Sequence, residues 1–220
     1  PASDSHGDGK KWASMRDRDF LKADCLSCHE KGVDGAREYD GSIDPHAAHD
    51  NLTCQACHVS NTIACLNCHF DQFLATGERK GNFVKGKDWL ILVNYQGEVT
   101  SGTVMSLVSN KRGYATFAPY ASHSITAKGR ACGDCHGSAH VKKVAGGGSV
   151  PVAKLEKGEL AFTEGVIPLV EGKVDVPFLD KGEDGEWVEL EPEGEPLHTL
   201  SGHAEYLTAE QLEKLAASQE

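Results

Sequence analysis

Four copies of one short motif, Cys-x-x-Cys-His, use all eight cysteines of this chain of 220 residues. The copies, called motifs 1 to 4 below, span Cys25–His29, Cys54–His58, Cys65–His69 and Cys132–His136. In each copy, two thiols three residues apart are followed directly by an imidazole. No cysteine is left for another purpose. Any fold of this chain therefore has to keep the two thiols and the imidazole of each motif available to act together.

The motif is the attachment signature of c-type haem. Two thiols add across the vinyl groups of the porphyrin, and the adjacent histidine reaches the iron as its proximal ligand. The predicted attachment residues are Cys25, Cys28, Cys54, Cys57, Cys65, Cys68, Cys132 and Cys135, and the predicted proximal ligands are His29, His58, His69 and His136. Zinc and thiol–disulfide motifs need no histidine at this position, so a paired zinc module is the weaker alternative. On these motifs the chain resembles the tetrahaem c-type cytochromes, with four covalently bound haem c groups.

Seven histidines outside the motifs supply candidates for the second axial ligand of each iron. They are His6, His46, His49, His123, His140, His198 and His203. Methionine is the other common distal ligand, but the chain has only Met15 and Met105, and Met105 lies among Val and Leu where we expect a core role. We therefore expect bis-histidine haems, which have lower potentials than His/Met haems.

Two of these histidines stand directly before motif 2. The run His46-x-x-His49-x4-Cys54-x-x-Cys57-His58 is similar to the pattern of class III cytochromes c. The resemblance implies that His46 ligates the haem of motif 2 and that His49 reaches a different haem. It covers about 13 residues, and the β segments and acidic C-terminal part depart from that family.

The other distal ligands are predicted from position alone. His123 precedes Cys132 by nine residues, a similar upstream placement, and is the third candidate. The fourth ligand stays open between His6 and a group formed by His140, His198 and His203. His6 lies in an arm of Ser, Asp and Gly, where a histidine without a ligand role would be solvated.

Composition predicts a small mixed α+β fold with few regular elements and no large sheet. Hydrophobic residues make up 39% of the chain and aromatic residues 7%, so the four haems are expected to serve as the core. Motifs 1 to 3 fall within 45 residues that contain few large apolar side chains. We expect this segment, mostly loop and short helix over residues 23–70, to fold only with its cofactors.

Three regions are expected along the chain. They are an N-terminal arm at 1–9, a haem-binding region at 10–145 with an inserted antiparallel β meander at about 83–119, and an acidic β-rich region at 146–220. The last region is predicted to end in a helix that Thr208 caps, with Gln211 completing a capping box.

The charge pattern limits the partners. The net charge is −11, and residues 141–220 carry 7 Lys and Arg against 17 Asp and Glu. Nucleic acid and anionic membrane surfaces are poor partners for such a chain, and no stretch approaches the length of a transmembrane helix. Haem is attached to these motifs outside the cytoplasm, so we expect an exported protein, periplasmic or extracellular, and Pro1-Ala2-Ser3 looks like a mature end.

Electron transfer without net chemistry is the expected function. Nitrite-reducing multihaem enzymes mark the catalytic haem with lysine in place of the motif histidine, and no motif here has that lysine, so a reductase is the weaker alternative. Six residues separate motifs 2 and 3, a tether of at most about 25 Å, so their haems are expected to be neighbours. The partners would be redox proteins or an extracellular acceptor.

Size, haem number and the His6 arm resemble extracellular tetrahaem cytochromes that polymerise into filaments. Members of that group complete one haem with a histidine from the next subunit, which implies copies of this chain as partners. A monomeric periplasmic shuttle is the alternative. A head-to-tail contact of this kind extends indefinitely unless rotation closes it.

His6→Ala tests the filament. If His6 ligates an iron of the next subunit, electron microscopy should show that the variant no longer polymerises, while its haem content stays that of the wild type. Unchanged filaments would contradict this role of His6.

Overall fold

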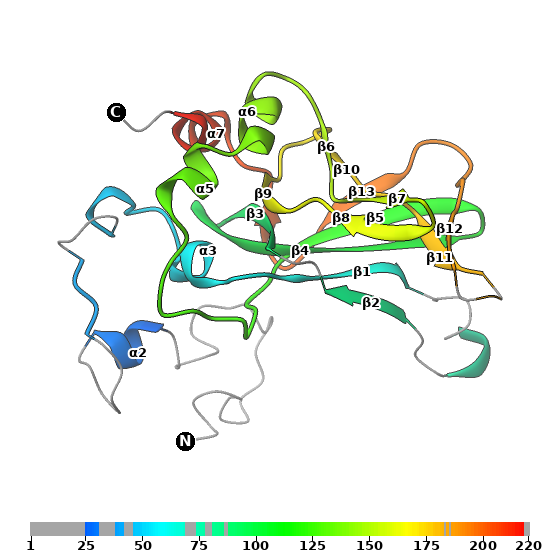
Figure 1. The fold of residues 1–220 in the computed structure, drawn as a ribbon, viewed down its shortest axis with the longest axis horizontal. Helices are drawn as coiled ribbons and strands as arrows, with labels where there is room; N and C mark the ends of the chain where they lie inside the picture. The colour runs from blue at the N-terminus through cyan, green and yellow to red at the C-terminus, as the bar shows by residue number, and fades with distance from the viewer. Residues whose placement is uncertain are drawn as a thin grey trace. The chain divides into compact units, whose positions relative to one another are not determined.

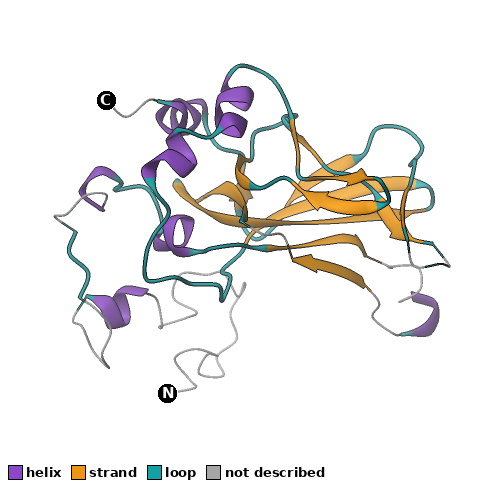
Figure 2. Ribbon diagram, in the orientation of Figure 1, coloured by secondary structure: helices purple, strands orange, loops and turns teal. Residues whose placement is uncertain are grey.

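The computed structural model describes residues 25–30, 38–41, 46–68, 74–77, 81–85, 88–182, 184 and 186–217. The chain divides into two compact units, Pro1–Cys54 and Gln55–Glu220. Short helices and many strands occur together (Figures 1 and 2), so the predicted small mixed α+β class is confirmed at this level. The N-terminal arm at 1–9 lies outside the described residues.

The first unit contains little regular structure among its described residues. Helix α2 spans Cys25–His29, the 3₁₀ helix η2 spans His46–Ala48, and helix α3 (Cys54–His58) begins at its last residue. None of its described residues is buried. A chain segment that buries no apolar side chain has little to offset the conformational entropy lost on folding.

An eight-stranded sheet dominates the second unit. Its strands are β1 (Ile63–Cys68), β2 (Gly81–Lys85), β3 (Trp89–Tyr95), β4 (Glu98–Ser109), β5 (Arg112–Pro119), β9 (Gly165–Pro168), β13 (Leu197–Leu200) and β14 (Ala204–Glu205). Strands β3, β4 and β5 pair antiparallel in sequence order, as the meander predicted. Both turns of the meander contain residues with positive φ, namely Gln96 and Gly97 in the first and Asn110 and Lys111 in the second.

The expectation that the chain forms no large sheet is wrong. Strands from the C-terminal part add to the meander instead of forming a layer of their own: β9 pairs parallel with β3, β13 pairs parallel with β5, and β14 pairs antiparallel with β3. Residues on both sides of position 146 therefore share one sheet. Three small two-stranded sheets complete the unit: β6 (Val150–Pro151) with β10 (Val174–Asp175), β7 (Ala153–Glu156) with β8 (Glu159–Phe162), and β11 (Leu179–Lys181) with β12 (Trp187–Glu189).

The second unit has a core of protein side chains. Strand β3 is buried along nearly its whole length, and Trp89, Phe117 and Ile167 are at most 1% exposed. Residues 102–107 of β4 alternate between buried and accessible positions, as in a sheet with one covered face. Val104 is therefore buried while Met105 is 42% exposed, so the core role expected for Met105 is wrong.

Three helices, α5 (Cys132–His136), α6 (Ala139–Ala145) and α7 (Ala209–Ala216), cluster beside β9 (Figure 1). The predicted cap of α7 is confirmed: the amide of Gln211 donates to Thr208 Oγ1 at 3.1 Å, and the amide of Thr208 donates to Gln211 Oε1 at 2.9 Å. No helix in the described part of the chain is both long enough and apolar enough to cross a membrane.

Two matched Ile→Ala substitutions test this core. Ile167 is fully buried against β3, whereas the side chain of Ile125 is 56% exposed. Ile167→Ala should lower the free energy of unfolding by about 2–5 kcal/mol, and Ile125→Ala by only about 0.5 kcal/mol. Urea denaturation of the two purified variants measures both values. Equal losses would contradict the packing described here.

Candidate haem-attachment sites

Three of the four motifs fold in the same way. Helices α2, α3 and α5 each begin at the first cysteine of a motif and end at its histidine. Residues three apart on a helix lie on one face, with their Cβ atoms about 5–6 Å apart. Motifs 1, 2 and 4 therefore present both thiols on one side, as attachment to one porphyrin requires. The sequence identified the motifs, and the helical turn gives them a common geometry.

Motif 3 is different because it lies on strand β1. Cys65 pairs in register with Phe83 of β2 and with Met105 of β4, and Ala64 and Leu66 on either side of it are fully buried. Residues three apart in a strand are separated by about 10 Å, and a register irregularity falls between Leu66 and Cys68. With β1 intact, motif 3 does not fit one macrocycle, and the loop or short helix expected here is wrong. Attachment at motif 3 requires β1 to end before Cys65.

A distant segment of the chain holds motif 2. The amide of Thr126 donates to the carbonyl of His58 at 2.9 Å, and the amide of Arg130 donates to the carbonyl of Cys57 at 2.9 Å. The Nδ1 atom of His58 lies 2.9 Å from the carbonyl oxygen of Thr126. Because a carbonyl oxygen only accepts, Nδ1 carries the hydrogen in this contact. A neutral imidazole held in this way keeps the lone pair of Nε2 for a metal.

Gly129 lies beside the Nε2 edge of the His58 ring. A Cβ atom built at this position would be 3.6 Å from both Nε2 and Cε1 of the ring, and 3.6 Å from Cβ of Cys57. The glycine therefore brings the backbone close to the ligand atom while leaving the adjoining space free of a side chain.

Motif 4 follows directly after this segment. Helix α5 begins after Ala131, whose amide donates to the carboxylate of Asp134 at 2.9 Å. The pKa of the Cys135 thiol is raised to about 11, mainly by burial and also by Cys57, against the opposing effect of the Arg130 charge. A thiol with this pKa stays protonated near neutral pH, unlike the thiolate of a disulfide-exchange enzyme.

The end of motif 2, Cys57 and His58, lies close to the segment before motif 4 in the second unit. The contacts of Thr126 and Arg130 with motif 2 end two residues before Cys132, and Cys57 and Cys135 are close enough for their charges to interact. The sequence had predicted that motifs 2 and 3 are neighbours, from the short tether between them. The contact between motifs 2 and 4 joins segments far apart in the chain, and spacing alone gave no signal of it.

His46 has the same ring arrangement as His58. Its Nδ1 donates to the carbonyl of Asp40 at 2.9 Å, and its ring packs against Tyr39 with centroids 4.7 Å apart. In a neutral ring, the Nε2 atom then carries no hydrogen and can accept a hydrogen bond or bind a metal. The amide of His49 donates to the carbonyl of His46 at 3.2 Å, which places both histidines on one turn.

Two further candidate ligands, His123 and His140, differ in their surroundings. His123 is exposed in the loop between β5 and α5. His140 lies on α6, and its Nε2 donates to the carbonyl of Glu164 at 3.0 Å. Ligation of an iron by His140 would therefore use Nδ1, or would need this bond to break.

The remaining histidines belong to the C-terminal part. His198 lies on β13 with its ring edge-on to Phe117, and burial lowers its pKa, while nearby Asp175 has the opposite effect. His203 is exposed at a turn with a φ of 60°. His6 and His69 lie outside the described residues.

Among the residues that the structure describes, no three His, Cys, Asp or Glu side chains gather as a metal site. A haem iron takes at most two axial ligands from the protein, so haem attachment does not call for such a group.

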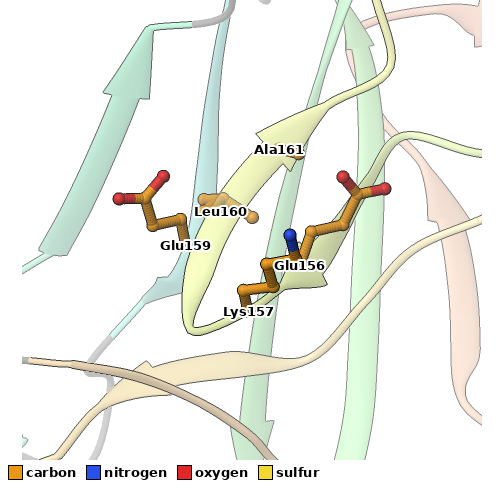
Figure 3. Close-up of a pocket in the computed structure, with 5 residues that line it drawn as sticks. All are labelled: Glu156, Lys157, Glu159, Leu160 and Ala161. Atoms are coloured by element: carbon orange, nitrogen blue, oxygen red, sulfur yellow. The ribbon is translucent and has the colours of Figure 1, made fainter.

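A hollow of about 410 Å³ occurs on the β7–β8 hairpin, and Figure 3 shows the five residues that line it. They are Glu156, Lys157, Glu159, Leu160 and Ala161. None of them is a cysteine or a histidine, so this hollow has none of the side chains by which the four motifs would bind haem.

No family model, no curated protein and no solved structure matches this chain. The assignment of the motifs therefore rests on their sequence and on the geometry of the residues around them.

Gly129→Leu tests the space beside His58. A leucine side chain there would occupy the room next to Nε2, so we expect haem attached at motif 2 to be lost or its iron to lose His58. Gly133→Leu is the matched control, because a Cβ atom at Gly133 meets nothing within 4 Å and motifs 1 and 3 have leucine at the equivalent position. Haem per chain, measured from the absorption of the pyridine complex, should fall only in Gly129→Leu. An equal loss in both variants would contradict the assignment.

Proposed function

We propose that this chain transfers electrons through c-type haems held at its Cys-x-x-Cys-His motifs. The observation that carries the proposal is the geometry at motif 2, where one helical turn presents both thiols and a backbone carbonyl fixes the tautomer of His58. When bound, haem supplies a one-electron iron couple, which none of the side chains alone provides.

The residues present fit the group at motifs 1, 2 and 4. Each helix places two cysteines and one histidine in the same order and on the same turn. Motif 3 keeps the signature, and a fourth haem there depends on the end of β1 leaving the sheet. His46 and His49 remain the proposed distal ligands on the class III resemblance, and the Asp40 contact supports His46 by leaving its Nε2 available.

The alternative thiol chemistry is less well supported. A disulfide-exchange site uses a cysteine whose pKa lies near or below neutral, whereas burial raises that of Cys135 to about 11. A multihaem reductase needs an iron with an open position, and the chain has seven histidines for at most four distal places.

Neighbouring motifs suggest a route for the electron. Residues Thr126 and Arg130, just before motif 4, bind His58 and Cys57 of motif 2 through backbone hydrogen bonds, in a unit that has its own side-chain core. A rigid scaffold between two haems keeps their separation constant, which a chain of haems that passes electrons requires. We propose motifs 2 and 4 as one step of the path.

Compartment and partners follow from this chemistry as part of the proposal. Attachment of c-type haem outside the cytoplasm implies export, and the donors and acceptors would be redox proteins, an extracellular acceptor or further copies of this chain. The acidic residues after position 140 favour a basic docking partner over nucleic acid.

Carbon monoxide binding tests electron transfer against catalysis. If every iron has two histidine ligands, the reduced wild-type protein should give a low-spin spectrum and should not bind carbon monoxide. His46→Ala should open one iron and bind about one equivalent per chain. A high-spin spectrum with carbon monoxide binding in the wild type would contradict electron transfer as the sole function.

A further inference from the structure

Arg130 is a buried cation between motifs 2 and 4. Its side chain is only 7% exposed, and it stands two residues before Cys132. Its amide binds the carbonyl of Cys57 at 2.9 Å, and its guanidinium donates to the carbonyl of Ser60 at 2.7 Å and to Asp88 Oδ1 at 2.9 Å.

The guanidinium is not fully satisfied by the described part of the chain. Its Nε atom is buried and has no hydrogen-bond partner there. A buried donor of a charged group is unfavourable unless an acceptor completes it. An acidic acceptor would suit this guanidinium.

The carboxylate that pairs with Arg130 is exposed to solvent. Asp88 is 61% exposed, so water screens its charge more than that of the buried guanidinium. The pair therefore acts on nearby buried groups as a net positive charge, and the bond of the guanidinium to Ser60, two residues after His58, places this charge beside motif 2. Arg130 also stands only two residues before Cys132, so the same charge lies beside motif 4.

A positive charge beside a haem favours the reduced iron, because oxidation adds one positive charge to the group. We propose that Arg130 is the residue that raises the reduction potentials of the haems at motifs 2 and 4 above those of the other haems. This inference rests on the proposed function. It makes Arg130 a positioning and tuning residue that sets which haems accept electrons first.

Three substitutions distinguish an effect of the Arg130 charge on the reduction potentials from an effect of lost packing. Arg130→Gln removes the cation and should shift the potentials of two haems downward, by an amount that changes their reduced-to-oxidised ratio on the order of tenfold at a fixed solution potential. Asp88→Asn removes the exposed counter-charge and should shift the same two upward, by a smaller amount. Arg130→Lys keeps the charge and should leave the potentials near those of the wild type.

The experiment is a spectroelectrochemical titration of the holoprotein, fitted with one component per haem, with haem content and circular dichroism recorded for each variant. Opposite shifts in Arg130→Gln and Asp88→Asn at unchanged haem content support the inference, since a loss of packing would not reverse sign with the charge. If Arg130→Gln fails to fold, the surface variant Asp88→Asn still decides by the presence or absence of its upward shift.

Unchanged potentials, or an equal shift of every haem, would overturn the role of Arg130 while leaving haem electron transfer in place. A wild-type protein without haem would instead overturn the proposed function and this inference together.

Discussion

The contact of residues 126–130 with the end of motif 2 is the interaction on which the proposed site depends. It consists of backbone hydrogen bonds between segments about 70 residues apart, strengthened by the His58 ring bond to Thr126. An isolated β-bridge between Val59 and Ile125 continues the contact toward the sheet. Because the bonding partners are backbone groups, the ring of His58 is held without a second ionisable side chain. The same contact brings Arg130 and the start of motif 4 close to the end of motif 2.

The two units differ in the interactions that stabilise each of them. The second unit buries Trp89, Phe117 and Ile167 in a side-chain core and does not need a cofactor to supply apolar surface. The described residues of the first unit bury nothing, and they include the whole of motif 1 and the first cysteine of motif 2. Covalent attachment of haem would contribute most to stability in the first unit, as a structural metal does in a small metal domain.

Local patterns in the sequence predicted the features that depend on neighbouring residues. The β-branched runs mark the meander, and Thr208 with Gln211 marks the start of the last helix. Features that join distant segments could not be found in this way. The parallel pairing of Trp89 with Gly165 leaves no local trace, so the large sheet was missed. Motif 3 lies on a strand because Ala64 and Leu66 alternate into the core, a pattern that the haem signature concealed.

Peptide mapping of the native protein by mass spectrometry tests the central claim most directly. Protease digestion would release the four motif segments separately, and covalent haem would add its mass to each peptide. We predict haem on motifs 1, 2 and 4, with both cysteines of each motif used, and on motif 3 only if the end of β1 leaves the sheet. Unmodified cysteines in motifs 2 and 4 would contradict it, because these motifs have the geometry that the proposal depends on.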